Sequence, residues 1–178
     1  MKIVVGLGNP GKEYDGTYHN VGTLAVRTIA GEGGWKPYKK LFSYALRRNT
    51  AFVLPLIFMN ESGRAVAEAL KKFRAEPADL VVIHDESDLP LGACKISTGR
   101  GSAGHKGVQS VMDALGSKAF ARVRIGIRNP RERTRRKAEG FVLAKITPRD
   151  LAALERIFVT LAEKGYLSGF TTAVDDGV

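Results

Sequence analysis

The sequence predicts an α/β fold in which helices cover both faces of a mixed, mostly parallel sheet. Short apolar segments typical of strands alternate along the chain with segments whose apolar residues recur at helical spacing. Residues 80–83 are apolar at every position, as expected of a strand buried on both faces of a parallel sheet. The length of 178 residues suits one domain, and we expect a single domain over residues 1–178.

The first half of the chain is expected to contain three strands and two helices. Apolar runs bounded by glycine or proline predict the strands, and apolar residues at helical spacing predict the helices. The strands are expected at residues 2–5, 42–48 and 50–54. The helices are expected between Val21 and Gly31 and over residues 65–73, before Pro77.

The second half is expected to add strands and two more helices. The strand over residues 80–83 would deliver His84 and Asp85 to its C-terminal end. Further strands are expected at residues 93–97, 122–128 and, more briefly, 140–143. Helices are expected over residues 108–115 and from Pro148 onward, the second with Thr147 as its N-cap.

Basic residues follow a regular pattern in the strand expected at residues 122–128. Arg122, Arg124 and Arg128 occupy every second position apart from a glycine, while the intervening positions are apolar. This pattern predicts that one face packs and the other presents guanidinium groups to solvent. The basic loop that follows carries Arg131, Arg133 and Arg135.

Composition excludes several classes of protein. With 44% hydrophobic and 26% charged residues the chain is neither disordered nor fibrous. The longest apolar run is broken by Pro55 and is too short to cross a membrane, and no signal-peptide pattern is present. We therefore expect a cytoplasmic protein without a membrane partner. A single cysteine, Cys94, excludes an internal disulfide and a cysteine zinc site.

The formal net charge of +10 is concentrated in particular segments. Residues 36–48 and 95–106 contain basic residues and no acidic ones, and residues 122–137 hold eight basic residues against Glu132 alone. Segregated positive charge is typical of a surface that binds a polyanion, which favours nucleic acid. Solvated charges without a partner are the alternative for any one segment.

The segment Gly6-Leu7-Gly8-Asn9-Pro10-Gly11 matches the glycine spacing of a dinucleotide-binding turn. In such turns a helix begins at the glycines, but the residues after Gly11 lack helical periodicity. The segment is better interpreted as a tight turn that places Asn9 at the end of a strand.

His19 is the best candidate for a general base. It lies at the start of the first expected helix, where the positive end of the helix dipole disfavours an imidazolium. A base of this kind needs a carboxylate to orient it, and Asp85 follows a buried strand of the same expected sheet. The chain has no G-x-S-x-G motif, so water is the expected attacking group.

Two other interpretations of these segments remain open. Asp85, Glu86 and Asp88 offer hard oxygen ligands that suit a metal-dependent nuclease, although few other acidic residues are available to complete such a site. Phe58 and Asn60 end an apolar run and either mark a helix entry or line a cleft, and Tyr14 is a further aromatic that stacks on a base in the second case.

Several segments, in this order along the chain, resemble the bacterial peptidyl-tRNA hydrolase family. They are Val5-Gly6-Leu7-Gly8-Asn9-Pro10-Gly11 with Tyr14 and His19-Asn20-Val21-Gly22, Phe58-Met59-Asn60-Glu61-Ser62-Gly63, His84-Asp85-Glu86-Ser87-Asp88-Leu89-Pro90-Leu91-Gly92, Gly101-Ser102-Ala103-Gly104-His105-Lys106-Gly107, Arg124-Ile125-Gly126-Ile127 and Gly140-Phe141-Val142-Leu143.

The resemblance implies a monomer that hydrolyses the ester between a peptide and the 3′-terminal ribose of tRNA, without a metal or other cofactor. His19 would be the base, Asp85 its orienting partner and Asn9 a contact to the peptide part of the substrate. The cleft for the peptide and terminal adenosine would be lined by Tyr14, Phe58, Asn60 and Lys106, and the tRNA backbone would be held by Arg122, Arg124, Arg128, Arg131, Arg133 and Arg135.

The sequence departs from the family pattern at two positions. Lys106 stands where many members have Asn, and an ammonium only donates whereas an amide also accepts. Tyr18 stands where Arg is frequent. A module that binds RNA without catalysis is the alternative function for the whole chain.

Overall fold

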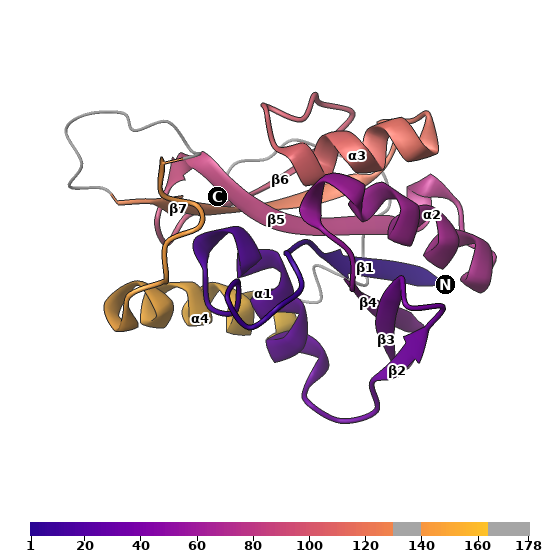
Figure 1. Ribbon diagram of the computed structural model, residues 1–178, viewed down its shortest axis with the longest axis horizontal. Helices are drawn as coiled ribbons and strands as arrows, with labels where there is room; N and C mark the ends of the chain where they lie inside the picture. Colours follow the sequence, from indigo (N-terminus) through magenta and orange to yellow (C-terminus); the bar gives the residue numbers. More distant parts are fainter. Residues whose placement is uncertain (130–139, 164–178) are drawn as a thin grey trace.

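The structure, a computed structural model, describes residues 1–129 and 140–163. Within these ranges seven strands form one sheet in the order β2-β3-β4-β1-β5-β7-β6 (Figure 1). The strands are β1 (Lys2–Gly6), β2 (Lys36–Tyr38), β3 (Phe42–Arg47), β4 (Thr50–Pro55), β5 (Leu80–Pro90), β6 (Cys94–Thr98) and β7 (Ala121–Arg128). The helices are α1 (Val21–Ala30), α2 (Ser62–Phe73), α3 (Lys106–Leu115) and α4 (Pro148–Glu163), with single 3-10 turns η1 (Tyr18–Asn20), η2 (Met59–Glu61) and η3 (Pro77–Asp79).

Parallel pairing forms the centre of the sheet. Strand β1 pairs in parallel with both β4 and β5, and β5 pairs in parallel with β7. The outer strands β2, β3 and β6 pair antiparallel. The mixed sheet expected from the sequence is therefore confirmed.

Helices cover both faces of this sheet, α1 and α4 on one side and α2 and α3 on the other (Figure 1). Val4 of β1 is buried in the core with Val26 of α1 and Leu154 of α4. Val5, the next residue, is buried in the opposite core, to which α2 and α3 also contribute. Each fully buried aliphatic side chain contributes about 1.5–3 kcal/mol relative to exposure, so β1 is held from both sides.

The expected ends of the helices are largely confirmed. Helix α1 ends before Gly31, α2 ends at Phe73, and α4 begins at Pro148. Thr147 caps α4 as expected, because its Oγ1 accepts a hydrogen bond of 3.2 Å from the N–H of Asp150. Strand β2 was not expected from the sequence, since its three residues lack an alternating apolar pattern.

Strand β5 is longer than expected. The apolar run ends at Ile83, but pairing with β7 continues to Pro90, which is registered with Arg128 across an irregularity after Glu86. His84 and Asp85 consequently lie inside a strand and not at its end. The polar extension is stable because its acidic side chains pair with arginines of β7.

Residues 141–143, where the sequence predicts a short strand, form a turn. Its carbonyl groups bond to the segment before α1: the N–H of His19 donates to the oxygen of Val142 at 2.7 Å, and the N–H of Tyr18 donates to that of Ala144 at 3.2 Å. The expectation of a strand at residues 140–143 is wrong because η1, a helical turn, takes these hydrogen bonds in place of a sheet partner.

The arginines of β7 are less exposed than expected. Because β7 lies between β5 and β6, Arg122 is buried, and its guanidinium donates to the carbonyl oxygen of Arg100 at 3.1 Å. Arg124 and Arg128 are partly buried. The expectation that this face presents guanidinium groups to solvent is wrong for Arg122. The loop arginines Arg131, Arg133 and Arg135 lie outside the described residues.

No helix in the described ranges is long and apolar enough to cross a membrane.

Candidate active site

The candidate site lies beyond the C-terminal end of β1, where the chain passes into the turn that carries Asn9. Helix α1 approaches this point closely. Leu7 N–H donates to the oxygen of Ile83 at 3.0 Å, and Thr23 N–H donates to the oxygen of Leu7 at 3.1 Å. Gly22 is needed here, because a Cβ at this position would overlap the carbonyl oxygen of Ile83. This contact sets the position of η1, which carries His19 immediately before α1.

His19 and Asp85 form the pair expected from the sequence. Nδ1 of His19 lies 2.9 Å from Oδ1 and 3.1 Å from Oδ2 of Asp85. An ionised carboxylate only accepts, so the proton of the neutral ring is on Nδ1 and the lone pair is on Nε2. The imidazole is 15% exposed, whereas Asp85 is buried. Nε2 is therefore the nitrogen that is available as a base.

Asp85 is held as a carboxylate although it is buried. Burial by itself raises the pKa of its carboxyl group, but the charge and hydrogen bond of His105, followed by those of His19, hold that pKa well below its usual value. Asp85 is therefore ionised at neutral pH and can orient His19.

His105 is a member of this cluster that reasoning from the sequence missed. Its Nε2 lies 2.9 Å from Oδ1 of Asp85, the same oxygen that His19 contacts. It is also the N-cap residue of α3, since its Nδ1 accepts a hydrogen bond of 3.3 Å from the N–H of Val108. The sequence signal that could have found it is the position of His105 in Gly104-His105-Lys106-Gly107, just before a predicted helix, where an N-cap residue is expected.

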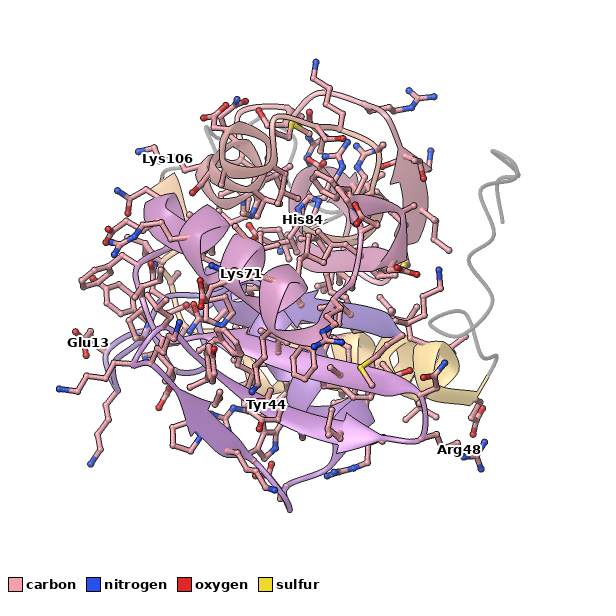
Figure 2. The ribbon with its side chains drawn as sticks, turned by 90° about the vertical axis from the view of Figure 1, so that its right-hand side faces the viewer. Glu13, Tyr44, Arg48, Lys71, His84 and Lys106 are labelled. Atoms are coloured by element: carbon pink, nitrogen blue, oxygen red, sulfur yellow. The ribbon has the colours of Figure 1, made fainter. Side chains whose placement is uncertain are left out.

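His84, labelled in Figure 2, lies in the interior and packs against His105. It is fully buried, and the two rings are 4.7 Å apart in an edge-to-face arrangement. Its Nδ1 donates to the backbone oxygen of Asp85 at 2.7 Å, while within the described part of the chain its Nε2 has no hydrogen-bond partner. Burial first, and then the charge of His105, lower the pKa of His84 well below its usual value, so this ring is neutral.

Asn9 is fixed by two neighbours. Its Oδ1 accepts a hydrogen bond of 2.8 Å from the N–H of Met59, which leaves the NH₂ group as the donor available to a ligand. Asn20, the residue after His19, clamps the backbone of Asn9: its Oδ1 accepts from Asn9 N–H at 2.8 Å, and its Nδ2 donates to Asn9 O at 2.9 Å. Asn20 is buried and was not singled out from the sequence.

The proposed cleft residues come from three segments. Tyr14 and Phe58 meet edge to face with ring centroids 6.2 Å apart, and half of the Phe58 side chain is exposed. Asn60 is exposed on η2, an element that contacts α3. Lys106 is the first residue of α3 and points outward at the edge of the molecule (Figure 2). The structure thus brings Tyr14 together with Phe58, and η2 against α3.

The acidic residues of the metal interpretation do not gather. Glu86 is paired with Arg124 at 3.0 Å, and Asp88 with Arg128 at 2.9 Å. In the described residues, the ligand-type atoms that do lie within 4.8 Å of one another belong to His19, Asp85 and His105. Two hydrogen bonds already join these atoms. The nuclease alternative is not favoured.

Known proteins are similar to this chain over most of its length. The family model described as Peptidyl-tRNA hydrolase matches residues 3–172. The chain is 38% identical over 161 residues to a peptidyl-tRNA hydrolase of Dinoroseobacter shibae, covering 87% of this chain and 67% of that protein. It is 39% identical over 160 residues to one of Sorangium cellulosum, covering 86% and 72% respectively. The crystal structure of peptidyl-tRNA hydrolase from Acinetobacter baumannii is similar with a TM-score of 0.77 and 29% identity, covering 94% of this chain and 91% of that one.

Proposed function

The chain belongs to the peptidyl-tRNA hydrolase family and has the hydrolase activity of that family, and we propose that His19 is the general base of its reaction. The bond broken is the ester between the peptide and the 3′-terminal ribose of tRNA. The products are free tRNA and a peptide with a free carboxylate.

One observation carries the assignment of His19: its Nδ1 is held by buried Asp85 at 2.9 Å while its Nε2 faces away from that partner. Nε2 takes a proton from water as the water oxygen attacks the ester carbonyl. The imidazolium that forms is stabilised by the Asp85 carboxylate. It then returns the proton to the ribose oxygen as the ester C–O bond breaks, so the base is regenerated.

Asn9 is proposed to contact the peptide part of the substrate through its free NH₂ group. This group is a fixed donor because Met59 N–H holds the amide oxygen. A fixed donor near a reacting carbonyl stabilises negative charge that develops there. Tyr14, Phe58, Asn60 and Lys106 are proposed to line the cleft for the peptide and the terminal adenosine.

Arg124 and Arg128 remain proposed contacts to the tRNA backbone, together with Arg131, Arg133 and Arg135, whereas Arg122 is buried and is not available for such a contact. For Arg124 and Arg128 such a contact has to compete with Glu86 and Asp88. A monomeric state in the cytoplasm and catalysis without a metal are also proposals. The cytoplasmic location rests on the translation-related substrate, and catalysis without a metal rests on a proton-transfer route that needs only side chains of this chain. The monomeric state rests on the resemblance to the family alone.

The decisive experiment measures peptide release from an N-blocked aminoacyl-tRNA by the parent, His19→Ala and His19→Asn, each with and without EDTA. Loss of a general base lowers kcat by about 10²–10⁴-fold, and we expect both variants to show that loss with tRNA binding retained. Urea unfolding of each variant controls for folding.

Three outcomes would each contradict part of the proposal. Full activity of His19→Ala removes the base assignment. Loss of the parent's activity in EDTA, with recovery on adding a divalent metal, supports metal catalysis. Binding of tRNA that weakens steeply with salt, without any peptide release by the parent, supports the RNA-binding module.

A further inference from the structure

We propose that His105 is a positioning residue for this reaction: it donates a hydrogen bond to Asp85 Oδ1, restrains that carboxylate and limits the negative charge that the carboxylate offers to His19. The proposal rests on the assignment of His19 as base. It gives the second histidine of the cluster a defined role that is separate from its role as a helix cap.

The hydrogen bonds of His105 define where its proton is. Nδ1 accepts from the backbone N–H of Val108 at 3.3 Å, so this nitrogen carries a lone pair. The proton of the neutral ring is therefore on Nε2, which lies 2.9 Å from Oδ1 of Asp85. The first turn of α3 thereby fixes the tautomer that can serve Asp85.

The carboxylate of Asp85 needs this second donor to stay in one orientation. His19 Nδ1 lies 2.9 Å from one oxygen and 3.1 Å from the other, so His19 alone does not distinguish between them. Asp85 is 3% exposed, and solvent is a poor substitute for a missing donor there. With His105 bound to Oδ1, the carboxylate plane is set by two rings whose centroids are 5.0 Å apart.

His105 also moderates the attraction between Asp85 and a proton on His19. Without the His105 hydrogen bond, the carboxylate charge is less stabilised and favours the imidazolium form of His19 more strongly. The base is then protonated over a wider range of pH. The direction is the same whether His105 acts as a neutral donor or as an imidazolium, because both stabilise the Asp85 charge.

Other groups near His19 do not reverse this direction. His84, which packs against His105, is kept neutral by burial. On the α4 side, Tyr18 donates to Asp150 at 2.5 Å, and burial followed by that hydrogen bond raises the pKa of Tyr18 to about 12. Tyr18 therefore stays protonated throughout the working range of pH. In the part of the chain that the structure describes, Asp85 lies within hydrogen-bonding distance of the His19 ring and His105 lies in ring contact with it.

Two substitutions separate the positioning role from the capping role. His105→Gln places an amide donor at about the reach of Nε2 but removes the cap to Val108. His105→Asn keeps a good N-cap side chain but is too short to reach Asp85. The pair is therefore a matched test in which each variant retains one of the two hydrogen bonds.

The measurement is the pH profile of kcat/KM for peptide release, with urea unfolding of each variant. We expect His105→Asn to lower kcat by roughly 10–100-fold, by analogy with the loss of hydrogen-bond partners that orient metal-bound histidines. The acidic limb of the pH profile of His105→Asn should move to higher pH. His105→Gln should keep most of the parent's kcat and the parent's acidic limb. A merely structural role predicts the opposite order, with the Asn variant nearer to the parent in both stability and rate.

The proposal is overturned if the two variants have the same profile, or if His105→Asn retains the parent's kcat and acidic limb. Should neither variant fold, ¹⁵N NMR of the histidine rings in the parent decides it, because an Nδ1–H tautomer of His105 is incompatible with the proposed donor. The base assignment fails separately, through His19→Ala alone.

Discussion

Asn20 connects the proposed base to the proposed substrate contact. It follows His19 directly, and its amide both accepts from and donates to the backbone of Asn9. Because Asn20 is buried, water does not readily replace either hydrogen bond. A single side chain therefore fixes the separation between Asn9 and His19.

Substitution of Asn20 should lower both stability and rate. Asn20→Asp keeps an acceptor for Asn9 N–H but cannot donate to Asn9 O, and Asn20→Ala loses both hydrogen bonds. Each buried group left unpaired costs about 1–3 kcal/mol, so we expect Asn20→Ala to be destabilised and to lose kcat more than KM. Urea unfolding and steady-state peptide release measure the two effects. Equal kcat in Asn20→Ala and the parent would show that the clamp is irrelevant to catalysis.

Residue identity in the site was predictable where a chemical rule applied. The rule that a histidine base needs a carboxylate led from His19 to Asp85, and the two side chains are in contact. No such rule led to His105, since Asp85 already had His19 as its expected partner and histidine is an unusual N-cap. The roles of these residues stay predictions until the variants are measured.

At the scale of elements, the contact between α1 and the sheet positions the site. Gly22 lies against the carbonyl oxygen of Ile83, where no side chain fits. Gly6 lies equally close to the backbone of Gly22 from the β1 side. The helix that follows His19 is therefore in backbone contact with β1 and β5, the latter carrying Asp85.

Gly22→Ala should displace α1 and with it His19. The added methyl group meets backbone, which cannot move aside as a side chain can. Overpacking of this kind costs about 1–3 kcal/mol, partly offset by about 1 kcal/mol of helix propensity. We expect lower stability in urea and a reduced kcat.

Gly33→Ala is the control, because its methyl group meets nothing within 4 Å, and its stability should stay within about 0.5 kcal/mol of the parent. A Gly22→Ala variant as active and stable as the control contradicts the argument.

Elements with their own periodicity or cap were predictable, and elements defined by distant partners were not. Helix α4 was located from Thr147 and Pro148, which are local signals. The extension of β5 to Pro90 depends on its pairing with β7. Residues 141–143 form a turn whose position is set by hydrogen bonds that N–H groups of η1 donate to this segment. Both corrections concern long-range hydrogen bonds, which leave no pattern in the local sequence.

At the scale of the whole molecule, the charge of the chain does not translate directly into surface charge. The sequence carries +10, with its positive charge concentrated in three basic segments, and the strand expected at residues 122–128 was predicted to present guanidinium groups to solvent. Arg124 and Arg128 instead pair with acidic residues 38 and 40 positions earlier, and Arg122 is buried. The electrostatic attraction for tRNA therefore has to come from the remaining basic residues or from competition for these pairs.

The stability of the whole molecule should fall in mildly acidic solution because of His84. An unfolded chain binds a proton at His84 below about pH 6.5, whereas the buried ring does not, since its pKa in the fold is well below that value. The unfolded state then holds more protons, so stability decreases as the pH falls from about 6.5, by up to about 1.4 kcal/mol per pH unit from this group. Asp85, whose pKa is depressed, loses its stabilising contribution only below the ordinary carboxyl range, so it does not obscure this window.

His84→Gln and His84→Leu remove the titrating ring and should flatten the dependence of the unfolding free energy on pH between about 5 and 6.5. The glutamine side chain retains a donor for the backbone oxygen of Asp85, and leucine does not, so the two variants will differ in absolute stability but share the reduced slope. Urea unfolding at a series of pH values measures the slope of the unfolding free energy against pH. A slope in both variants equal to that of the parent would assign the acid sensitivity to other groups. Among the described residues Nε2 of His84 has no hydrogen-bond partner, which already costs the fold stability at neutral pH. His84→Leu should therefore lose less stability at neutral pH than the replacement of a fully hydrogen-bonded buried histidine would.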